Sequence, residues 1–247
     1  MAEEKTQDTG TGVREAAVRV AEGHFVELDY TIRLKDTGEL VDTTIEEVGV
    51  SAGWTGRVYG PRVAVVGRGY LLRAIEEALT GMAENETKVI EIPPERAFGP
   101  RDPSKVKVIP LRRFKDVDQP LTVGMRVMVD GREGYIRSIE SGRVQVDFNH
   151  RLAGKTLVAE VHLRRIILDD VEKVYSLIRA FLPEASRENT KVEVAKPEVT
   201  VRLGKEVYST AGISTAKQAI ARETLENIEG VEKVVFIEEY IKEKPTT

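Results

Sequence analysis

The amino-acid sequence predicts an α+β fold made of three parts, and three observations lead to this prediction. Residues 25–34 alternate apolar and polar side chains, the pattern of a half-buried strand. An amphipathic helix pattern over residues 70–79 precedes another strand pattern at 87–92. The strand-rich pattern then stops near Pro100 and resumes near Asn149, which indicates a domain inserted into the first one.

The first part begins with a predicted hairpin. The segment "FVELDYTIRL" is followed by an Asp-Thr-Gly turn, and "ELVDTT" starts the return strand. Residues 46–61 contain four glycines and are predicted to form a long loop. A central helix is then predicted, with Gly81 as its stop. Its apolar positions at helical spacing are Leu71, Leu72, Ile75 and Leu79.

The inserted segment has a different character. "RVMVDGREGYIRSIESGRVQVDF" contains three short alternating runs, separated by Asp130-Gly131 and Ser141-Gly142, and predicts a small all-β meander. Residues 100–147 carry 10 basic and 7 acidic side chains, whereas residues 24–99 carry 8 basic and 13 acidic ones. This change of sign favours a separate module.

The last part follows Asp169-Asp170, with patterns in the order helix, strand, strand, helix, strand. We therefore expect a separate α+β module over residues 170–247. The first 22 residues are mostly polar and are predicted to form a flexible tail.

Composition excludes several classes of function. The chain of 247 residues has no cysteine, which excludes disulfides, thiolate metal sites and cysteine nucleophiles and fits a reducing cytoplasm. No apolar run reaches the ~18–20 residues that a membrane span requires. The net charge is −4, and the basic surplus of residues 100–147 is only 3 charges without clustered aromatic residues. We therefore expect neither a membrane nor a nucleic acid as partner.

The order of these pieces resembles one family. The motifs are "YTIRLKDTGELVDTT", "YGP", "VVGRGYLLRAIEEALTGM", "PPERAFG", "DPSKVKVIP" and "VDFNHRLAGKTL". Together they resemble FKBP-type peptidyl-prolyl cis-trans isomerases of the SlyD-like kind, in the long archaeal form with an extra C-terminal domain. The resemblance implies an FKBP-like antiparallel sheet wrapped on one helix over residues 23–99 plus 149–168. It implies a client-binding β domain inserted at residues 100–148.

The implied reaction needs no nucleophile and no cofactor. Rotation about a prolyl bond costs ~18–20 kcal/mol because amide resonance is lost in the twisted state. A catalyst must only bind the twisted form better than the planar one, and ~8 kcal/mol would give about a million-fold acceleration. An apolar hollow with dipoles at its rim would suffice.

The resemblance assigns this hollow to particular residues. Tyr30, Asp42 and Phe98 are implied as catalytic residues, although without the resemblance Asp42 would more readily be read as a surface or turn carboxylate. The best-known members have tyrosine at the position of Phe98, tryptophan at Ile75, and often an aromatic residue at Ala159. Phe98 is expected to keep the wall but to lose the hydrogen bond of the tyrosine hydroxyl, whereas Ile75 and Ala159 predict a shallower or reshaped pocket. The implied substrate-binding residues are Val41, Tyr59, Leu71, Leu72, Ile75 and Ala97.

The stretch "NHRLAGK" is where the chain re-enters the isomerase domain. Asn149 is expected to form a side-chain to backbone turn there. His150 and His162 are expected to be structural, and no metal site is predicted.

Unfolded or partly folded proteins with exposed prolyl bonds are the expected partners. Exposed apolar residues of the insert would bind them, and tethering them beside the pocket would raise the local concentration of prolyl bonds. The alternative is that these side chains form the insert's own core. The residues expected to bind clients are Met125, Val127, Met128, Tyr135 and Ile139.

Two functions follow, one of them favoured. The favoured one is a cytoplasmic, cofactor-free prolyl isomerase that accelerates proline-limited folding and binds unfolded chains. The alternative is a client-binding chaperone with little or no isomerase activity. The C-terminal module could dimerise, enlarge the client surface or stabilise the chain, and a homodimer is the favoured role.

Overall fold

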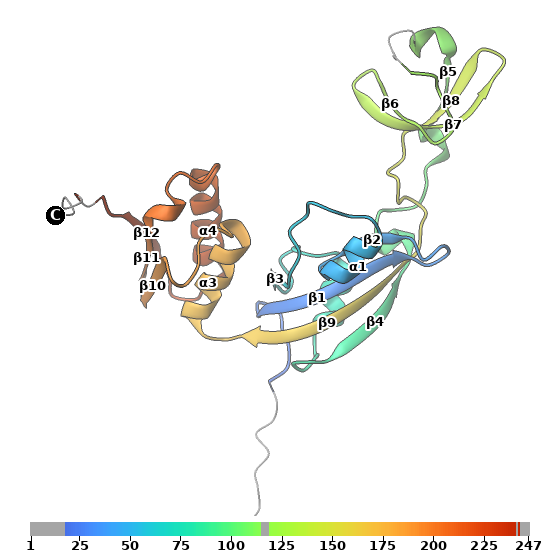
Figure 1. Cartoon of the computed structure of the whole chain (residues 1–247). Coiled ribbons are helices and arrows are strands. Elements are labelled where there is room, and N and C mark those ends of the chain that lie inside the picture. Colours follow the sequence, from blue (N-terminus) through green and yellow to red (C-terminus); the bar gives the residue numbers. More distant parts are fainter. Residues whose placement is uncertain (1–17, 115–118, 241, 243–247) are drawn as a thin grey trace, which may run out of the picture.

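The computed structural model describes residues 18–114, 119–240 and 242 and shows three bodies in a row (Figure 1). A central domain carries the insert at one end and the C-terminal domain at the other. Strands and helices occur in all the parts expected, and the α+β fold class is confirmed. In the part of the chain that is described, no helix is both long enough and apolar enough to span a bilayer.

The central domain is a five-stranded antiparallel sheet in the order β2-β1-β9-β4, with β3 also paired to β1. β1 pairs with β9 from Phe25–Ile167 to Leu34–Leu157, so the sheet closes only after the chain returns from the insert. The strands are β1 (Phe25–Leu34), β2 (Leu40–Thr43), β3 (Arg62–Val65), β4 (Thr87–Ile92) and β9 (Leu157–Ile167).

One face of this sheet packs on helix α2 (Arg73–Leu79), which begins later than the periodic pattern predicted. Leu71 and Leu72 therefore lie in the turn that enters the helix. The predicted loop over 46–61 is partly wrong, because α1 (Glu46–Ser51) forms there. A short 3-10 helix, η1 (Pro94–Arg96), follows β4.

The predicted tail over residues 1–22 is too long at its C-terminal end. Residues 1–17 lie outside the described part, but Val20 is 3% exposed and belongs to the central core. Its N–H donates to the carbonyl of Met82 (2.9 Å), and its carbonyl accepts from Gly81 (2.8 Å). The central domain thus already includes this residue.

The insert is a four-stranded antiparallel sheet in the order β5-β8-β7-β6. β5 was not predicted, because its pattern "VKVIP" is short and ends in proline. The elements are η2 (Pro103–Lys105), β5 (Val106–Pro110), η3 (Leu111–Phe114), β6 (Arg126–Val129), β7 (Arg132–Glu140) and β8 (Arg143–Asp147).

The C-terminal domain follows the predicted order, with two helices on one face of a three-stranded sheet (Figure 1). β11 pairs antiparallel with β10 and parallel with β12. The elements are α3 (Asp170–Phe181), β10 (Thr190–Ala195), β11 (Glu198–Leu203), η4 (Lys205–Val207), α4 (Ile213–Asn227) and β12 (Lys233–Glu238).

The central and C-terminal domains share one hydrophobic core. The back of the central sheet presents Phe25, Val63, Val65 and Ile167, all buried against the C-terminal helices. Leu177 and other residues of α3 and α4 complete this core. At its edge the buried carboxylate of Glu27 accepts from Arg165 (2.6 Å) and Arg179 (2.8 Å). The C-terminal domain is therefore packed on the sheet and not merely tethered to it.

Candidate active site

A cavity of about 220 Å³ opens where β1, β2, the entry to α2 and the segment after η1 meet. Ile75, on α2, is 1% exposed and forms part of its floor. Most of the wall is apolar, which keeps water scarce and suits the ring of a proline. The lining residues are Tyr30, Ile32, Val41, Asp42, Arg62, Tyr70, Leu71, Leu72, Ile75, Phe98 and Leu157.

Tyr30 and Asp42 form a polar rim of the cavity, and a chain of side-chain contacts continues from Asp42 to Arg57 and Trp54 outside it. The Tyr30 hydroxyl donates to Asp42 Oδ2 (2.8 Å), and Arg57 donates to Asp42 Oδ1 (3.1 Å). The guanidinium of Arg57 in turn lies over the ring of Trp54, 4.6 Å from its centroid. Burial, followed by the hydrogen bond to Asp42, raises the pKa of Tyr30 to about 12, so the hydroxyl stays protonated.

The backbone behind this rim is fixed by buried hydrogen bonds of the first hairpin. The N–H of Tyr30 donates to Thr44 Oγ1 (3.0 Å), whose hydroxyl donates to Asp29 Oδ1 (2.8 Å). Arg164, on β9, closes the set by donating to Asp29. Because each buried polar atom has a partner, the strand that carries Tyr30 has little freedom to shift.

The entry to α2 is held by Glu76, a buried residue of that helix. Its carboxylate accepts from the backbone N–H groups of Gly67 (3.1 Å), Gly69 (3.2 Å) and Leu71 (3.0 Å). The loop that carries Tyr70 and Leu71 into the cavity is thereby tied to the helix that forms its floor.

Phe98 closes the opposite side of the cavity and is supported from behind by His150. The two rings stack in parallel, with centroids 4.5 Å apart and an interplanar angle of 6°. His150 Nδ1 also accepts from the N–H of Leu152 (3.2 Å), within the turn that returns the chain from the insert. His162, by contrast, lies in mid-strand, and its Nδ1 contacts Thr87 Oγ1 (2.9 Å).

Seven of the nine predicted site residues line this one cavity. Tyr59 lies instead in an adjoining groove, with its hydroxyl donating to the carbonyl of Trp54 (2.8 Å). Ala97 was predicted to bind substrate, but it packs on the central core and does not line the cavity. Ala159 is fully buried in the sheet, and Leu157 is the β9 residue that reaches the wall.

Sequence reasoning missed three residues of the site: Arg57, Arg62 and Tyr70. Arg57 and Arg62 flank the quoted motif "YGP", and Tyr70 stands directly before the leucine pair, so only their nearness to recognised motifs could have indicated them. Each owes its role to contacts with residues distant in the chain.

The two connections to the insert are clamped by Asn149, which is 7% exposed. Its Oδ1 accepts from the N–H of Asp102 (2.8 Å), and its Nδ2 donates to the Asp102 carbonyl (2.8 Å) and to Asp147 Oδ1 (2.7 Å). Asp147 also accepts from Arg101 (2.8 Å) and Arg137 (2.9 Å). The expected turn at Asn149 is thus a bridge between the outgoing and returning segments.

The predicted client-binding residues of the insert are not all at its surface. Val127 is 4% exposed and belongs to the insert's core, so its prediction as a contact residue is wrong. Met125 and Ile139 are half-buried against that core, and Tyr135 is half-buried with its hydroxyl donating to Glu133 (3.2 Å). Four other apolar side chains, three of them not predicted, are more exposed. They are Val108 (59%), Leu111 (43%), Val123 (67%) and Met128 (63%).

The geometry defines a site for binding a distorted substrate, not for attacking one. Phenol, carboxylate and guanidinium are hydrogen-bonded to one another at the rim, and the remaining wall is mainly apolar. Within the described residues there is no group of three histidine, aspartate or glutamate side chains placed to hold a metal ion. The class that such a site defines is an isomerase acting on a peptide bond.

Comparisons with known proteins agree with this class. The family model described as FKBP-type peptidyl-prolyl cis-trans isomerase matches residues 17–113. Models described as "FKBP26, IF domain" and "FKBP26_C-terminal" match residues 107–152 and 170–241.

Three curated relatives each match 60% of this chain. A short-type peptidyl-prolyl cis-trans isomerase of Methanocaldococcus jannaschii is 35% identical over 149 residues, which are 60% of this chain and 94% of the relative. A probable FKBP-type 16 kDa isomerase of Pseudomonas fluorescens is 31% identical, covering 60% and 92%. The isomerase SlyD of Treponema pallidum is 30% identical, covering 60% and 79%. The chain belongs to the FKBP-type peptidyl-prolyl cis-trans isomerase family and is SlyD-like.

Proposed function

We propose that this isomerase accelerates proline-limited folding of unfolded chains in the cytoplasm, by holding them on the insert and turning their prolyl bonds in the cavity. The observation that carries the catalytic half is the gathering of Tyr30, Asp42, Leu72 and Phe98 around one apolar hollow. Unfolded or partly folded proteins with exposed prolyl bonds are the proposed partners.

The residues that line the cavity determine how the substrate binds and how its prolyl bond is turned. The prolyl ring enters between Phe98 and Ile75, and the flanking backbone lies along the rim formed by Tyr30 and Asp42. A twisted amide has lost resonance, so its carbonyl and nitrogen are solvated differently from those of the planar form. Rim dipoles that are already oriented stabilise this form without reorganising, and scarce water strengthens them.

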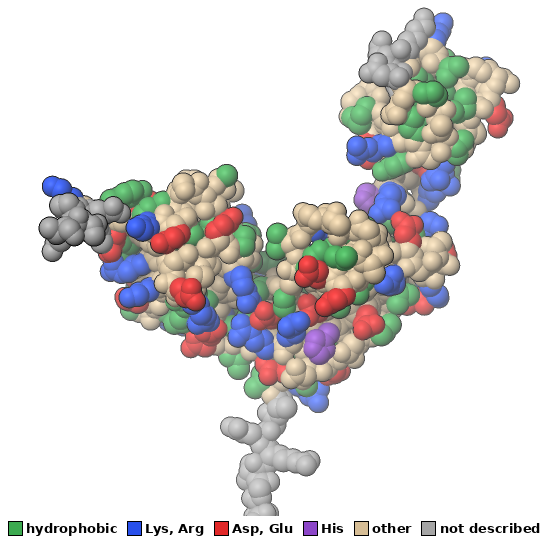
Figure 2. All heavy atoms as spheres, viewed as in Figure 1, with side chains coloured by type: hydrophobic (Ala, Val, Ile, Leu, Met, Phe, Trp, Pro, Cys, Tyr) green, Lys and Arg blue, Asp and Glu red, His purple; other side chains and the backbone are tan. Residues whose placement is uncertain are grey.

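The exposed apolar side chains of the insert support the holding step. Val108, Leu111, Val123 and Met128 lie outside the insert's core, and Figure 2 shows hydrophobic side chains in several places on its visible face. Methionine adapts its shape to different partners, which suits a surface that meets many sequences. The insert stands away from the central domain (Figure 1), so a bound chain can extend toward the cavity.

A protease-free isomerisation assay on a short prolyl peptide tests the catalytic half. The full chain should accelerate exchange clearly, and Asp42→Ala combined with Phe98→Ala should lower kcat/KM at least about tenfold, which is ~1.4 kcal/mol of lost transition-state stabilisation. Suppression of aggregation should survive in this double variant. A wild-type chain that only matched the spontaneous rate would favour the alternative of a chaperone without useful catalysis.

The insert is tested separately, with a variant that keeps its core. Replacing the four exposed apolar residues by serine should slow catalysed refolding of a proline-limited protein while leaving tetrapeptide turnover unchanged. Val89→Ser, at an apolar residue of β4 that is 65% exposed, is the matched control and should leave both readouts unchanged. If the fourfold variant refolds the protein as fast as wild type, the insert does not hold clients through this surface.

The homodimer through the C-terminal domain stays a prediction. Light scattering of the full chain measures it directly.

A further inference from the structure

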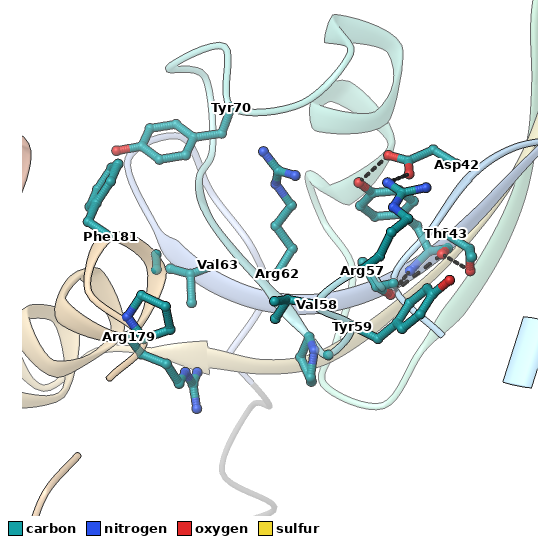
Figure 3. Close-up of a pocket in the computed structure, with 16 residues that line it drawn as sticks. Asp42, Thr43, Arg57, Val58, Tyr59, Arg62, Val63, Tyr70, Arg179 and Phe181 are labelled. Carbon is teal, nitrogen blue, oxygen red and sulfur yellow. Dashed lines mark hydrogen bonds and ion pairs between the residues drawn. The ribbon is translucent and has the colours of Figure 1, made fainter. Parts of the chain in front are cut away.

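The prolyl cavity continues into a larger groove of about 540 Å³ between the central and C-terminal domains. Tyr30, Asp42, Arg62 and Tyr70 line both spaces, so the two are continuous. The far wall of the groove belongs to the end of α3, and Figure 3 shows Phe181 there, facing Tyr70. A peptide with its proline in the cavity would therefore extend naturally over the C-terminal domain.

The two walls of this groove are held in fixed relation. The Tyr70 hydroxyl donates to Glu223 on α4, joining residues that are 153 positions apart. Glu27 of β1 pairs with Arg179 of α3 (2.8 Å), and the shared core lies beneath. Because these links are already made, a bound chain meets a preformed surface and need not order it.

The three arginines along the groove differ in their partners. Arg57 is paired with Asp42 (3.1 Å), and Arg179 is paired with Glu27. Arg62 is exposed and lies close to the Tyr30 hydroxyl, and it makes no ion pair with any residue that the structure describes. Figure 3 shows its side chain between Tyr70 on one side and Asp42 with Arg57 on the other, at the junction of cavity and groove.

We propose that the substrate chain next to the prolyl bond lies in this groove and that Arg62 selects an acidic side chain within it. The guanidinium offers a planar set of donors that fits a carboxylate. A lysine at the same place would meet three arginines and a single aspartate that is already paired. Prolyl bonds of a folding protein are mostly far from a chain end, so the carboxylate is that of a glutamate or aspartate side chain.

This inference rests on the proposed catalytic role of the cavity, and its test reads the two separately. Blocked ten-residue peptides carry glutamate, glutamine or lysine at the second, third or fourth position on either side of one proline. Isomerisation is measured without protease, and the readout is the ratio of kcat/KM for the glutamate and glutamine peptides with the same enzyme. We expect a ratio of about three to ten for positions on one side of the proline only, which corresponds to about 0.6–1.4 kcal/mol.

Variants of Arg62 then identify the source of the preference. Arg62→Gln should bring the ratio to one, and Arg62→Glu should reverse the ranking in favour of the lysine peptide. Arg68→Gln is the matched control, because Arg68 is an exposed arginine of the adjoining loop that lines neither space. It should keep the wild-type ratio.

A second arm tests the C-terminal wall of the groove. Ala180 is exposed at the end of α3, so Ala180→Trp fills the groove without disturbing the core. It should raise KM for ten-residue peptides and not for tetrapeptides. Glu184→Trp, at an exposed residue just after α3 that lines neither space, is the control and should change neither.

Several results would overturn the proposal. If the wild-type ratio is near one while the glutamine peptides are turned over well, the proposed role of the groove is wrong and the proposed role of the catalytic cavity is unaffected. Equal turnover of the peptides by wild type and by the Asp42→Ala, Phe98→Ala double variant would instead show that the cavity is not the catalytic site. If unblocked versions of the same peptides, with a free C-terminal carboxylate, gained and the blocked glutamate peptides did not, Arg62 would be assigned to chain ends. A change in oligomeric state with Arg62→Glu would assign the groove to a second copy.

Discussion

Phe98 and His150 stack in parallel 4.5 Å apart, and this contact joins the wall of the prolyl cavity to the turn that returns from the insert. Phe98 is 36% exposed, so without the imidazole its ring would have open space behind it. His150 was expected to be structural, and its place in the turn and its stack on Phe98 give that role a link to the active site.

Removing the imidazole of His150 should make the Phe98 wall of the cavity less rigid. An aromatic pair contributes about 0.5–1.5 kcal/mol, so His150→Ala should lower kcat/KM for a prolyl peptide by roughly two- to tenfold. His150→Phe should retain most of the activity, because the stacked ring is kept. His162→Gln, remote from the cavity, should behave as wild type. Equal rates for His150→Ala and wild type would show that Phe98 needs no support.

Asp147 should make the insert's attachment sensitive to acid. Its burial favours the neutral form, but hydrogen bonds from Asn149, Arg137 and Arg101 outweigh this and lower the pKa of Asp147 to about 2. Since the folded pKa lies below that of an unfolded aspartate, the stabilisation is present above about pH 4 and is lost as pH falls toward about 2. The corresponding free energy is on the order of 2 kcal/mol.

Unfolding at a series of pH values measures this effect as a difference between variants. The gap in unfolding free energy between wild type and Asp147→Asn should be constant from neutral pH down to about 4 and shrink below it. Asp130→Asn, an exposed aspartate of the insert paired with Arg113, is the control and should show only a small gap. A gap for Asp147→Asn that did not change with pH would contradict the assignment.

Glu76 should affect both stability and substrate binding. Its carboxylate accepts three backbone N–H groups, and Glu76→Gln replaces one acceptor oxygen by a donor that faces them. We expect a loss of about 1–3 kcal/mol in unfolding free energy and a raised KM, because Tyr70 and Leu71 lose their fixed position. Glu77→Gln breaks only an exposed helix pair with Arg73 (2.9 Å) and the contact with Arg96, and should cost less than about 1 kcal/mol.

The shared core should make the central and C-terminal domains unfold together. Trp54 is the single tryptophan and lies in the central domain, so its fluorescence reports that domain alone. Leu177→Ala, in α3, should nevertheless lower the free energy of unfolding that is measured from Trp54 fluorescence by about 2–5 kcal/mol. Val144→Ala, in the separate core of the insert, should leave that transition in place. If Leu177→Ala left the unfolding transition of Trp54 fluorescence unchanged, the two domains would unfold independently.

Periodicity predicted the elements in which apolar and polar residues alternate. β1, β4 and the order of elements after residue 169 follow directly from their patterns. The prediction that β1 is half-buried was wrong, because its polar side chains Glu27 and Asp29 are also buried, in ion pairs with arginines. β3 was missed because it is covered on both sides: Ala64 faces the central core, whereas Val63 and Val65 face the C-terminal helices. A strand buried on both faces loses its polar alternation, and only the fold reveals what covers it.

The site residues were predictable where the sequence carries a motif that resembles the family's. They were not predictable where the role of a residue depends on a contact with a residue far away in the sequence. Tyr30, Asp42 and Leu72 were assigned by resemblance, and the structure places them around one cavity. Tyr70 acquires its partner 153 residues later, and no local pattern encodes that contact. Val127 was misassigned because alternation separates the two faces of a strand without saying which one is buried.

The pairing of β1 with β9 has a consequence for how this enzyme is itself made. β1 ends at Leu34, but its longest partner spans Leu157–Ile167, after the whole insert has been synthesised. The apolar back of the strand, at Phe25, is covered only when α3 and α4 have also left the ribosome. Because these contacts join residues that are far apart in the sequence, we expect slow folding and a prolonged exposure of unpaired strand edges. A nascent copy of this isomerase therefore resembles, for much of its own synthesis, the unfolded chains that we propose as its substrates.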